Sequence, residues 1–443
     1  MRRLLAVAAA AALAVATLAA CGQDVPDPAR DWLAVQPGVV SAEVLSDHSG
    51  AWSSSGLVRG ELDPAITDSA LTTLIGAVRD HAAQNGDVAF WLGIDDLDLA
   101  VGDDTAGTVS LWRSLRGVDG VLSGIVHDGE VRARTLRADA PTVLEALLSL
   151  PGALRLEAFA DAAAADADRA ADIEKDEPNT SAFEFVRPTG CEPTAPVLML
   201  ATDLVSRDEF PGATADLCSG FTLDVPIEAP FAGAAASLRA ELDDQGLGDF
   251  PVQLTADDGA GTVHFAAISP GDPSLLQVLQ VFDGDTVPPG LSYSLGPDGT
   301  LAITGYTVPT ADLVTLVQTA PRASELAAIG LEGDPVSIAG TLDQLPRLLG
   351  EAIALDEASD AFGSVTLGQG FGTVYLDASG TNTPDVAKAA ADLRASGATD
   401  RRYFTVIYRS YQADIVNGLA ALHDPGYVGA DVMVAFVDAW NAG

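Results

Sequence analysis

The chain has 443 residues, of which 48% are hydrophobic, so it can bury packed cores and is not a disordered polymer. Its 63 acidic residues outnumber 23 basic ones, and the formal net charge is −40. Nucleic acids and anionic lipid headgroups bind clustered Lys and Arg, so this balance excludes nucleic-acid binding and predicts repulsion from such headgroups. The acidity serves solubility in the simplest interpretation, and attraction of cations or basic partners is the alternative.

The first element is an apolar leader that ends at a cysteine. Met1-Arg2-Arg3 precedes an uninterrupted apolar run from residue 4 to 20, and Leu18-Ala19-Ala20-Cys21 closes it. Two arginines, a short apolar stretch and small residues before a cleavage point are typical of a secretory signal peptide. Cys21 at that point resembles the lipobox of bacterial lipoproteins. The resemblance implies acylation of Cys21 by a fatty acid such as palmitate, and anchoring in the cell membrane on the extracytoplasmic face.

Two other interpretations of the leader remain open: an uncleaved transmembrane helix, and an ordinary signal peptide with an incidental cysteine. Beyond its leader, the chain resembles lipoproteins of high-GC Gram-positive bacteria, which implies a location and no activity. The sequence suggests the following divisions: a signal peptide (1–20), a tether (21–36), an N-terminal α+β domain (37–160), an acidic and alanine-rich linker (161–193), a middle α+β domain (194–287) and a C-terminal α+β domain (288–443).

A weak repeat runs through the body of the chain. In three copies a proline follows a strand-like, glycine-led segment after 12 residues: Gly129 and Pro141, Gly261 and Pro273, and Gly372 and Pro384. Looser copies pair Gly299 with Pro309 and Gly56 with Pro64. Asp-Gly turns before several of these segments indicate hairpins, and proline fits the first turn of a helix.

The predicted unit is therefore strand–turn–strand–helix. Tandem units of this kind predict an α+β fold with antiparallel sheets and helices on one face. The order of elements in two adjacent units resembles a permuted ferredoxin-like fold in its topology only.

The cysteine count predicts one disulfide. Once Cys21 is acylated, Cys191 and Cys218 remain as an even pair in an exported protein, where disulfides persist. A metal site at this pair would need further ligands, and there is no second cysteine pair to supply them.

Known catalytic motifs are absent. The sequence contains no G-x-S-x-G, no S-x-x-K and no H-E-x-x-H, so no catalytic residue, cofactor or metal is predicted. His264 alternates with apolar neighbours on an expected strand but has no partner visible in the sequence. The acidic groups at 95–98 and 103–104 could bind calcium, although they lack the spacing of an EF-hand loop and aspartate is common in turns.

Residues 401–411 form the best candidate binding surface, with three arginines and three tyrosines in an acidic chain. On one continuous strand Tyr403, Arg409 and Tyr411 would share a face, with Arg402 beside them. Tyr and Arg are enriched in binding hot spots, while an ordinary strand with paired arginines is the alternative.

These observations favour a membrane-anchored, non-enzymatic lipoprotein that binds a ligand or another envelope protein. The alternatives are a hydrolase whose site assembles only in three dimensions and a solute-binding lipoprotein of a transporter.

Overall fold

The computed structural model describes residues 26–45, 56–85, 88–102, 105–161, 183–283, 287–377, 385–397, 403–423 and 431–442. The chain divides into two compact units, Met1–Phe221 and Thr222–Gly443, and each is described by itself. The leader and Cys21 lie outside the described residues, as do Arg402, Pro384 and most of the expected linker. Among the described residues, no helix has both the length and the apolar character needed to span a membrane.

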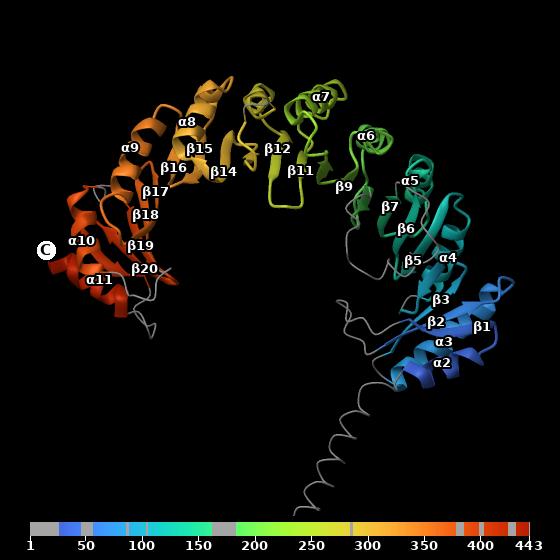
Figure 1. The fold of residues 1–443 in the computed structure, drawn as a ribbon. Helices are drawn as coiled ribbons and strands as arrows, with labels where there is room; N and C mark the ends of the chain where they lie inside the picture. The colour runs from blue at the N-terminus through green and yellow to red at the C-terminus, as the bar shows by residue number, and fades with distance from the viewer. Residues whose placement is uncertain are drawn as a thin grey trace, which may run out of the picture. The chain divides into compact units, whose positions relative to one another are not determined.

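Unit 1 alternates hairpins with helices (Figure 1). Its elements are α2 (Pro26–Ala34), β1 (Val39–Leu45), β2 (Gly56–Leu62), α3 (Asp68–Asn85), β3 (Val88–Ile94), β4 (Leu97–Ala100), α4 (Thr105–Arg116), β5 (Val121–His127), β6 (Glu130–Leu136), α5 (Ala140–Leu148), β7 (Arg155–Asp161), β8 (Phe183–Arg187), α6 (Ala195–Val205) and β9 (Gly212–Asp216). β10 (Gly220–Asp224) spans the division between the units.

Unit 2 continues the same pattern (Figure 1). Its elements are α7 (Phe231–Asp244), β11 (Val252–Asp257), β12 (Val263–Ser269), the 3₁₀ segment η2 (Pro273–Phe282), β13 (Ser292–Leu295), β14 (Thr300–Pro309), α8 (Thr310–Thr319), the short η3 (Ala323–Glu325), β15 (Ala328–Asp334), β16 (Val336–Gly340), α9 (Leu345–Asp356), β17 (Phe362–Gly368), β18 (Phe371–Leu376), α10 (Val386–Ala395), β19 (Tyr403–Tyr408), β20 (Tyr411–Val416), β21 (Leu419–Leu422) and α11 (Asp431–Ala442).

Strands pair in chain order within each unit. The two strands of a hairpin are antiparallel, as in β5–β6 and β17–β18, and consecutive hairpins are joined by parallel pairs, as in β6–β7 and β18–β19. In unit 2, β21 adds a last antiparallel strand beside β20. The α+β class and the strand–turn–strand–helix unit are thus confirmed.

The sheets are mixed rather than wholly antiparallel. After each hairpin a helix returns the chain to the end of the sheet where the second strand of that hairpin began. The next strand therefore runs parallel to that second strand and pairs with it. In the split βαβ unit of ferredoxin-like folds another strand lies between the parallel pair, whereas here the parallel strands are adjacent.

Prolines and glycines mark the unit boundaries largely as the repeat predicts. Pro141 lies in the first turn of α5, and Pro273 begins η2, which is 3₁₀ rather than α-helical. Gly129, with φ +86°, lies in the β5–β6 turn, where that backbone conformation favours glycine. In the third copy the turn glycine is Gly370, with φ +81°, while Gly372 lies within β18.

In both units the helices lie on one face of the sheet, and that face holds the core (Figure 1). Strand residues alternate between this buried side and an open side, as in β18, where Val374 and Leu376 are buried while Phe371 and Tyr375 are exposed. Leucines of the helices, such as Leu348 and Leu355 in α9, complete the core. The opposite face of each sheet is covered by no helix of the described residues.

Two expected connecting segments contain regular structure. Residues 26–34 of the expected tether form α2, whose Leu33 is fully buried and which packs on β1 and β2. The expected linker 161–193 includes β8, which pairs with β7. The three-domain division itself stays a prediction, and compactness divides the chain at 221/222 instead.

The last strand of unit 2 is capped by side chains of α11. The Asn441 amide accepts a hydrogen bond from the Ala420 N–H at 3.0 Å and donates to the Ala420 carbonyl at 2.9 Å. The Trp440 indole N–H donates to the Gly418 carbonyl at 3.0 Å. The backbone N–H and carbonyl of Ala420, at the edge of the sheet, are therefore satisfied within the chain.

Candidate binding surface

The predicted surface at 401–411 is a hairpin rather than one strand. Tyr403 begins β19 on the open face, but the chain reverses at Arg409, which has φ +56°. Because Tyr408 pairs directly with Tyr411, both lie on the helix-covered side of the sheet. The prediction that Tyr403, Arg409 and Tyr411 share a face is therefore wrong, since it assumed that the strand continues through the turn. Arg402 lies outside the described residues.

Tyr403 belongs instead to a surface formed by neighbouring strands. Direct cross-strand pairing places Ala302, Gly330, Ala339, Gly368, Phe371 and Tyr403 in one row across β14–β19. A second row crosses β14–β20 and contains Thr304, Glu332, Ser337, Thr366, Thr373, Thr405 and Asp414. A third row contains Ser364, Tyr375, Ile407 and Gln412. We call the part of these rows on β16–β19 the open-face patch: Ser337, Ala339, Ser364, Thr366, Gly368, Phe371, Thr373, Tyr375, Tyr403, Thr405 and Ile407.

Aromatic side chains stand out from the open-face patch. Phe371, Tyr375 and Tyr403 are 41%, 44% and 54% exposed, although aromatic residues are only 6% of the chain. The Phe371 ring lies over Gly368, where an added Cβ would collide with the ring. Gly330, two strands away in the same row, has open space where a Cβ would lie. The first row therefore has small residues on β14–β17 and two aromatic side chains, Phe371 and Tyr403, that project from β18 and β19.

The open-face patch carries no charged side chain in a protein of net charge −40. With strands about 4.8 Å apart and a rise of about 3.4 Å per residue, the four strands of the open-face patch cover about 14 by 14 Å. Exposed patches of a few hundred Å², rich in aromatic residues and free of charge, are typical of interaction sites on soluble proteins.

Two acidic residues of the second row flank the open-face patch, Glu332 on β15 and Asp414 on β20. Asp414 accepts hydrogen bonds from Gln412 Nε2 at 2.7 Å and Thr405 Oγ1 at 3.3 Å, and it contacts His423 Nδ1 at 3.0 Å. Partial burial opposes ionisation, but these partners outweigh it, so the pKa of Asp414 lies below its usual value. Asp414 is therefore ionised at neutral pH. Glu332 is exposed, and its carboxylate contacts the hydroxyls of Thr304 and Tyr306 at 3.4 and 3.5 Å.

The open face of unit 1 differs, because its charges pair with one another. Glu157 is buried and accepts from Arg132 at 2.7 Å and from Arg155 at 2.5 Å. Burial, followed by repulsion from Glu157, raises the pKa of Glu184. The charge of the buried Glu157 is therefore compensated by two arginines of the same face.

A second ion-pair cluster of unit 1 surrounds Arg59, which bonds Asp98 at 2.9 Å and Glu61 at 2.9 Å. Burial raises the pKa of Asp98 to about 6, against the opposing effect of Arg59. Asp98 lies across Gly93, where a Cβ would collide with its carboxylate. Asp98 belongs to the acidic segment at 95–98, and no group of three or more His, Cys, Asp or Glu in the described ranges is placed to hold a metal ion.

His264 faces the helix side of unit 2 and has an aromatic partner. Its ring stacks on Tyr293 with centroids 4.1 Å apart, and Nε2 lies 3.2 Å from the Leu291 carbonyl, to which it donates. Nδ1 of His264 and the hydroxyl of Tyr293 are buried without a hydrogen-bond partner among the described residues. Burial lowers the pKa of His264 and raises that of Tyr293. Neither the groove beside α9 and α10 nor the pocket beside α7 and η2 is lined by His264 or Tyr293.

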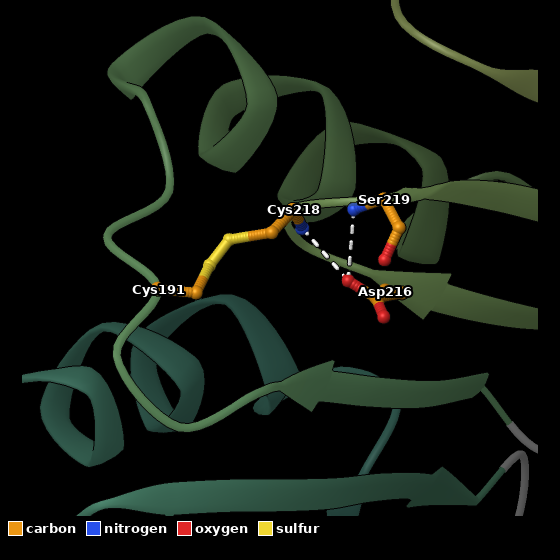
Figure 2. The surroundings of a disulfide bond; sticks show 4 residues. All are labelled: Cys191, Asp216, Cys218 and Ser219. Carbon is orange, nitrogen blue, oxygen red and sulfur yellow. Dashed lines mark hydrogen bonds between the residues drawn. A yellow bond between two sulfur atoms is a disulfide. The ribbon is translucent and has the colours of Figure 1, made fainter.

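Cys191 and Cys218 are bonded to each other, with their Cα atoms 6.5 Å apart (Figure 2). The bond connects the segment before α6 to the turn between β9 and β10. In that turn Asp216 Oδ1 accepts from the backbone N–H groups of Cys218 and Ser219, both at 2.9 Å (Figure 2). Burial favours the neutral form of the Asp216 carboxyl, but the hydrogen bonds outweigh it, so the pKa of Asp216 lies below its usual value. The predicted disulfide is confirmed, and it links two segments of unit 1.

A groove of 710 Å³ lies beside α9, α10 and the β17–β18 turn. Its charged lining residues include Arg347 and Glu351, which pair with each other at 2.7 Å, and Asp392, which pairs with Lys388 at 2.8 Å. With its charges already paired and no buried nucleophile or base in its lining, the groove has no catalytic constellation.

Sequence reasoning found Tyr403 and missed most of its surroundings. The signal available was the alternation of Phe371, Thr373 and Tyr375 with buried neighbours, repeated in β19. Comparison with protein-family models, with curated proteins and with solved structures found no match.

Proposed function

We propose that the protein is a non-enzymatic lipoprotein, anchored through acylated Cys21 to the extracytoplasmic face of the cell membrane, and that it binds another envelope protein through the open face of the unit 2 sheet. The observation that carries the binding role is the open-face patch, because it exposes Phe371, Tyr375 and Tyr403 without any charged side chain. Aromatic residues surrounded by small and hydroxyl-bearing side chains supply large contact area at little entropic cost.

The anchor is supported by the leader and the lipobox-like segment before Cys21. The disulfide fits the same location, because such bonds persist outside the cytosol. Metabolic labelling with a fatty acid tests the anchor. Wild-type protein should incorporate the label and Cys21→Ser should not; label that persists in the variant would refute the anchor.

The binding role is tested in intact cells with a photo-crosslinking amino acid at position 375 of the full chain. Position 434 is the matched control, because Val434 is also exposed, at 42%, but lies on α11. A defined crosslinked product at 375 that is absent at 434 is expected. Equal products at both positions would contradict the proposal.

A further inference from the structure

The open-face patch carries no charge, and its second row is flanked by Glu332 on β15 and Asp414 on β20. We infer that its occupant is a protein surface with an apolar centre and Lys or Arg at its rim, which docks flat across β16–β19 between Glu332 and Asp414. The inference rests on the proposed function and names the chemistry of the partner.

The centre of the contact is set by Phe371, Tyr375 and Tyr403. The area of the open-face patch, about 200 Å², is about a quarter of the roughly 800 Å² that each partner buries in a standard interface. The open-face patch is therefore large enough for the desolvated core of an interface, which is depleted in charge and rich in aromatic residues. The low position at Ala339, next to Gly368 and the Phe371 ring that lies over it, fits a projecting apolar side chain of the partner.

The rim of the contact is set by the two acids. Glu332 and Asp414 lie five strands apart, or about 24 Å, so both can contact the edge of one partner. Charges at a rim act on the association rate and on partner choice. An acidic rim on a chain of net charge −40 attracts a basic partner and repels an acidic one.

The same charge argues against a second copy of this chain as the occupant. Two copies docked face to face would each bring a net charge of −40 and the same acidic rim. A glycan chain could stack on the aromatic rings and donate hydroxyl hydrogen bonds to Glu332, but a neutral glycan would bind independently of salt.

The test begins with the crosslinked product at position 375. After identification by mass spectrometry, the purified partner is titrated against the full-length lipid-anchored protein in detergent at about 50 mM and about 300 mM salt, where the Debye length falls from about 14 Å to about 6 Å. We expect binding to weaken with salt, and Glu332→Gln to weaken it about two- to fivefold at low salt and much less at high salt.

The centre is tested with a matched pair of glycine variants. Gly368→Ala should weaken binding by at least about fivefold, because the new methyl group displaces the Phe371 ring. Gly330→Ala adds the same methyl group to open space and should leave binding unchanged. Circular dichroism and thermal unfolding of each variant confirm that its fold is retained.

The outcomes separate the two claims. No difference between positions 375 and 434 would reject the proposed binding role and the inference with it. A specific product whose affinity ignores both salt and Glu332→Gln would reject the inference alone. A crosslinked homodimer of purified protein, or salt-independent binding to isolated cell-wall glycan, would likewise overturn the basic protein partner.

Discussion

The disulfide should contribute a large part of the stability of unit 1. Cys191 and Cys218 are separated by 27 residues. On the chain-entropy model, closing a loop of this size stabilises the folded state by about 3.5 kcal/mol at 25 °C. For a unit of roughly 200 residues this corresponds to a fall of about 7–14 °C in the unfolding midpoint when the bond is removed. The double variant Cys191→Ser/Cys218→Ser is the perturbation.

The turn should survive the loss of sulfur, because Asp216 accepts from the backbone N–H groups of Cys218 and Ser219, which the substitutions leave in place. The variant therefore isolates the covalent link. Differential scanning calorimetry with and without dithiothreitol is the assay. The unfolding midpoint of the reduced wild type should match that of the variant, and reductant should not change the midpoint of the variant. Equal midpoints for oxidised wild type and variant would refute the loop-closure reasoning.

Three further outcomes are expected. Gly76→Ala adds a methyl group to open space in helix α3 and should stabilise unit 1 by up to about 1 kcal/mol, whereas Gly93→Ala should destabilise unit 1 because the new methyl group displaces Asp98. Urea denaturation measures the free energy of unfolding of both variants, and a stabilising Gly93→Ala would contradict the packing. His264 has a lowered pKa in the folded state, so the unfolded state binds its proton first, and stability falls as pH drops below about 6.5. His264→Phe should flatten that part of the urea–pH profile, and an unchanged slope would contradict the burial argument. Asn441→Ala should leave the edge strand β21 uncapped and promote association measurable by light scattering, and a strictly monomeric variant would show that the cap is dispensable.

Local features of the fold could be predicted from the sequence because they depend on neighbouring residues. Gly129 needs a left-handed turn and Pro141 fits a first helical turn, so the hairpin and the helix start follow from residue chemistry. The Cys191–Cys218 bond followed from the count of cysteines and the expected compartment.

What could not be predicted depends on pairing between distant strands. The parallel joining of hairpins is decided by how each helix packs back on its sheet, which no local pattern specifies. The second row joins Glu332 to Asp414 across six strands, so its members are dispersed along the chain. The prediction that Arg409 lies within a strand is wrong for a related reason. Tyr and Arg are compatible with a strand, and only the pairing of Tyr408 with Tyr411 shows that the chain turns at Arg409.

Pairing in chain order has a consequence for how the protein acquires its structure. Each hairpin within a unit hydrogen-bonds to the hairpins immediately before and after it, so sequence separations between contacting strands stay short and loop-closure costs are low. A chain that emerges N-terminus first can therefore add one hairpin and one helix at a time to a surface already formed, without waiting for distant segments. Folding of this kind would suit the proposed export of the chain, in which its structure is completed after it crosses a membrane.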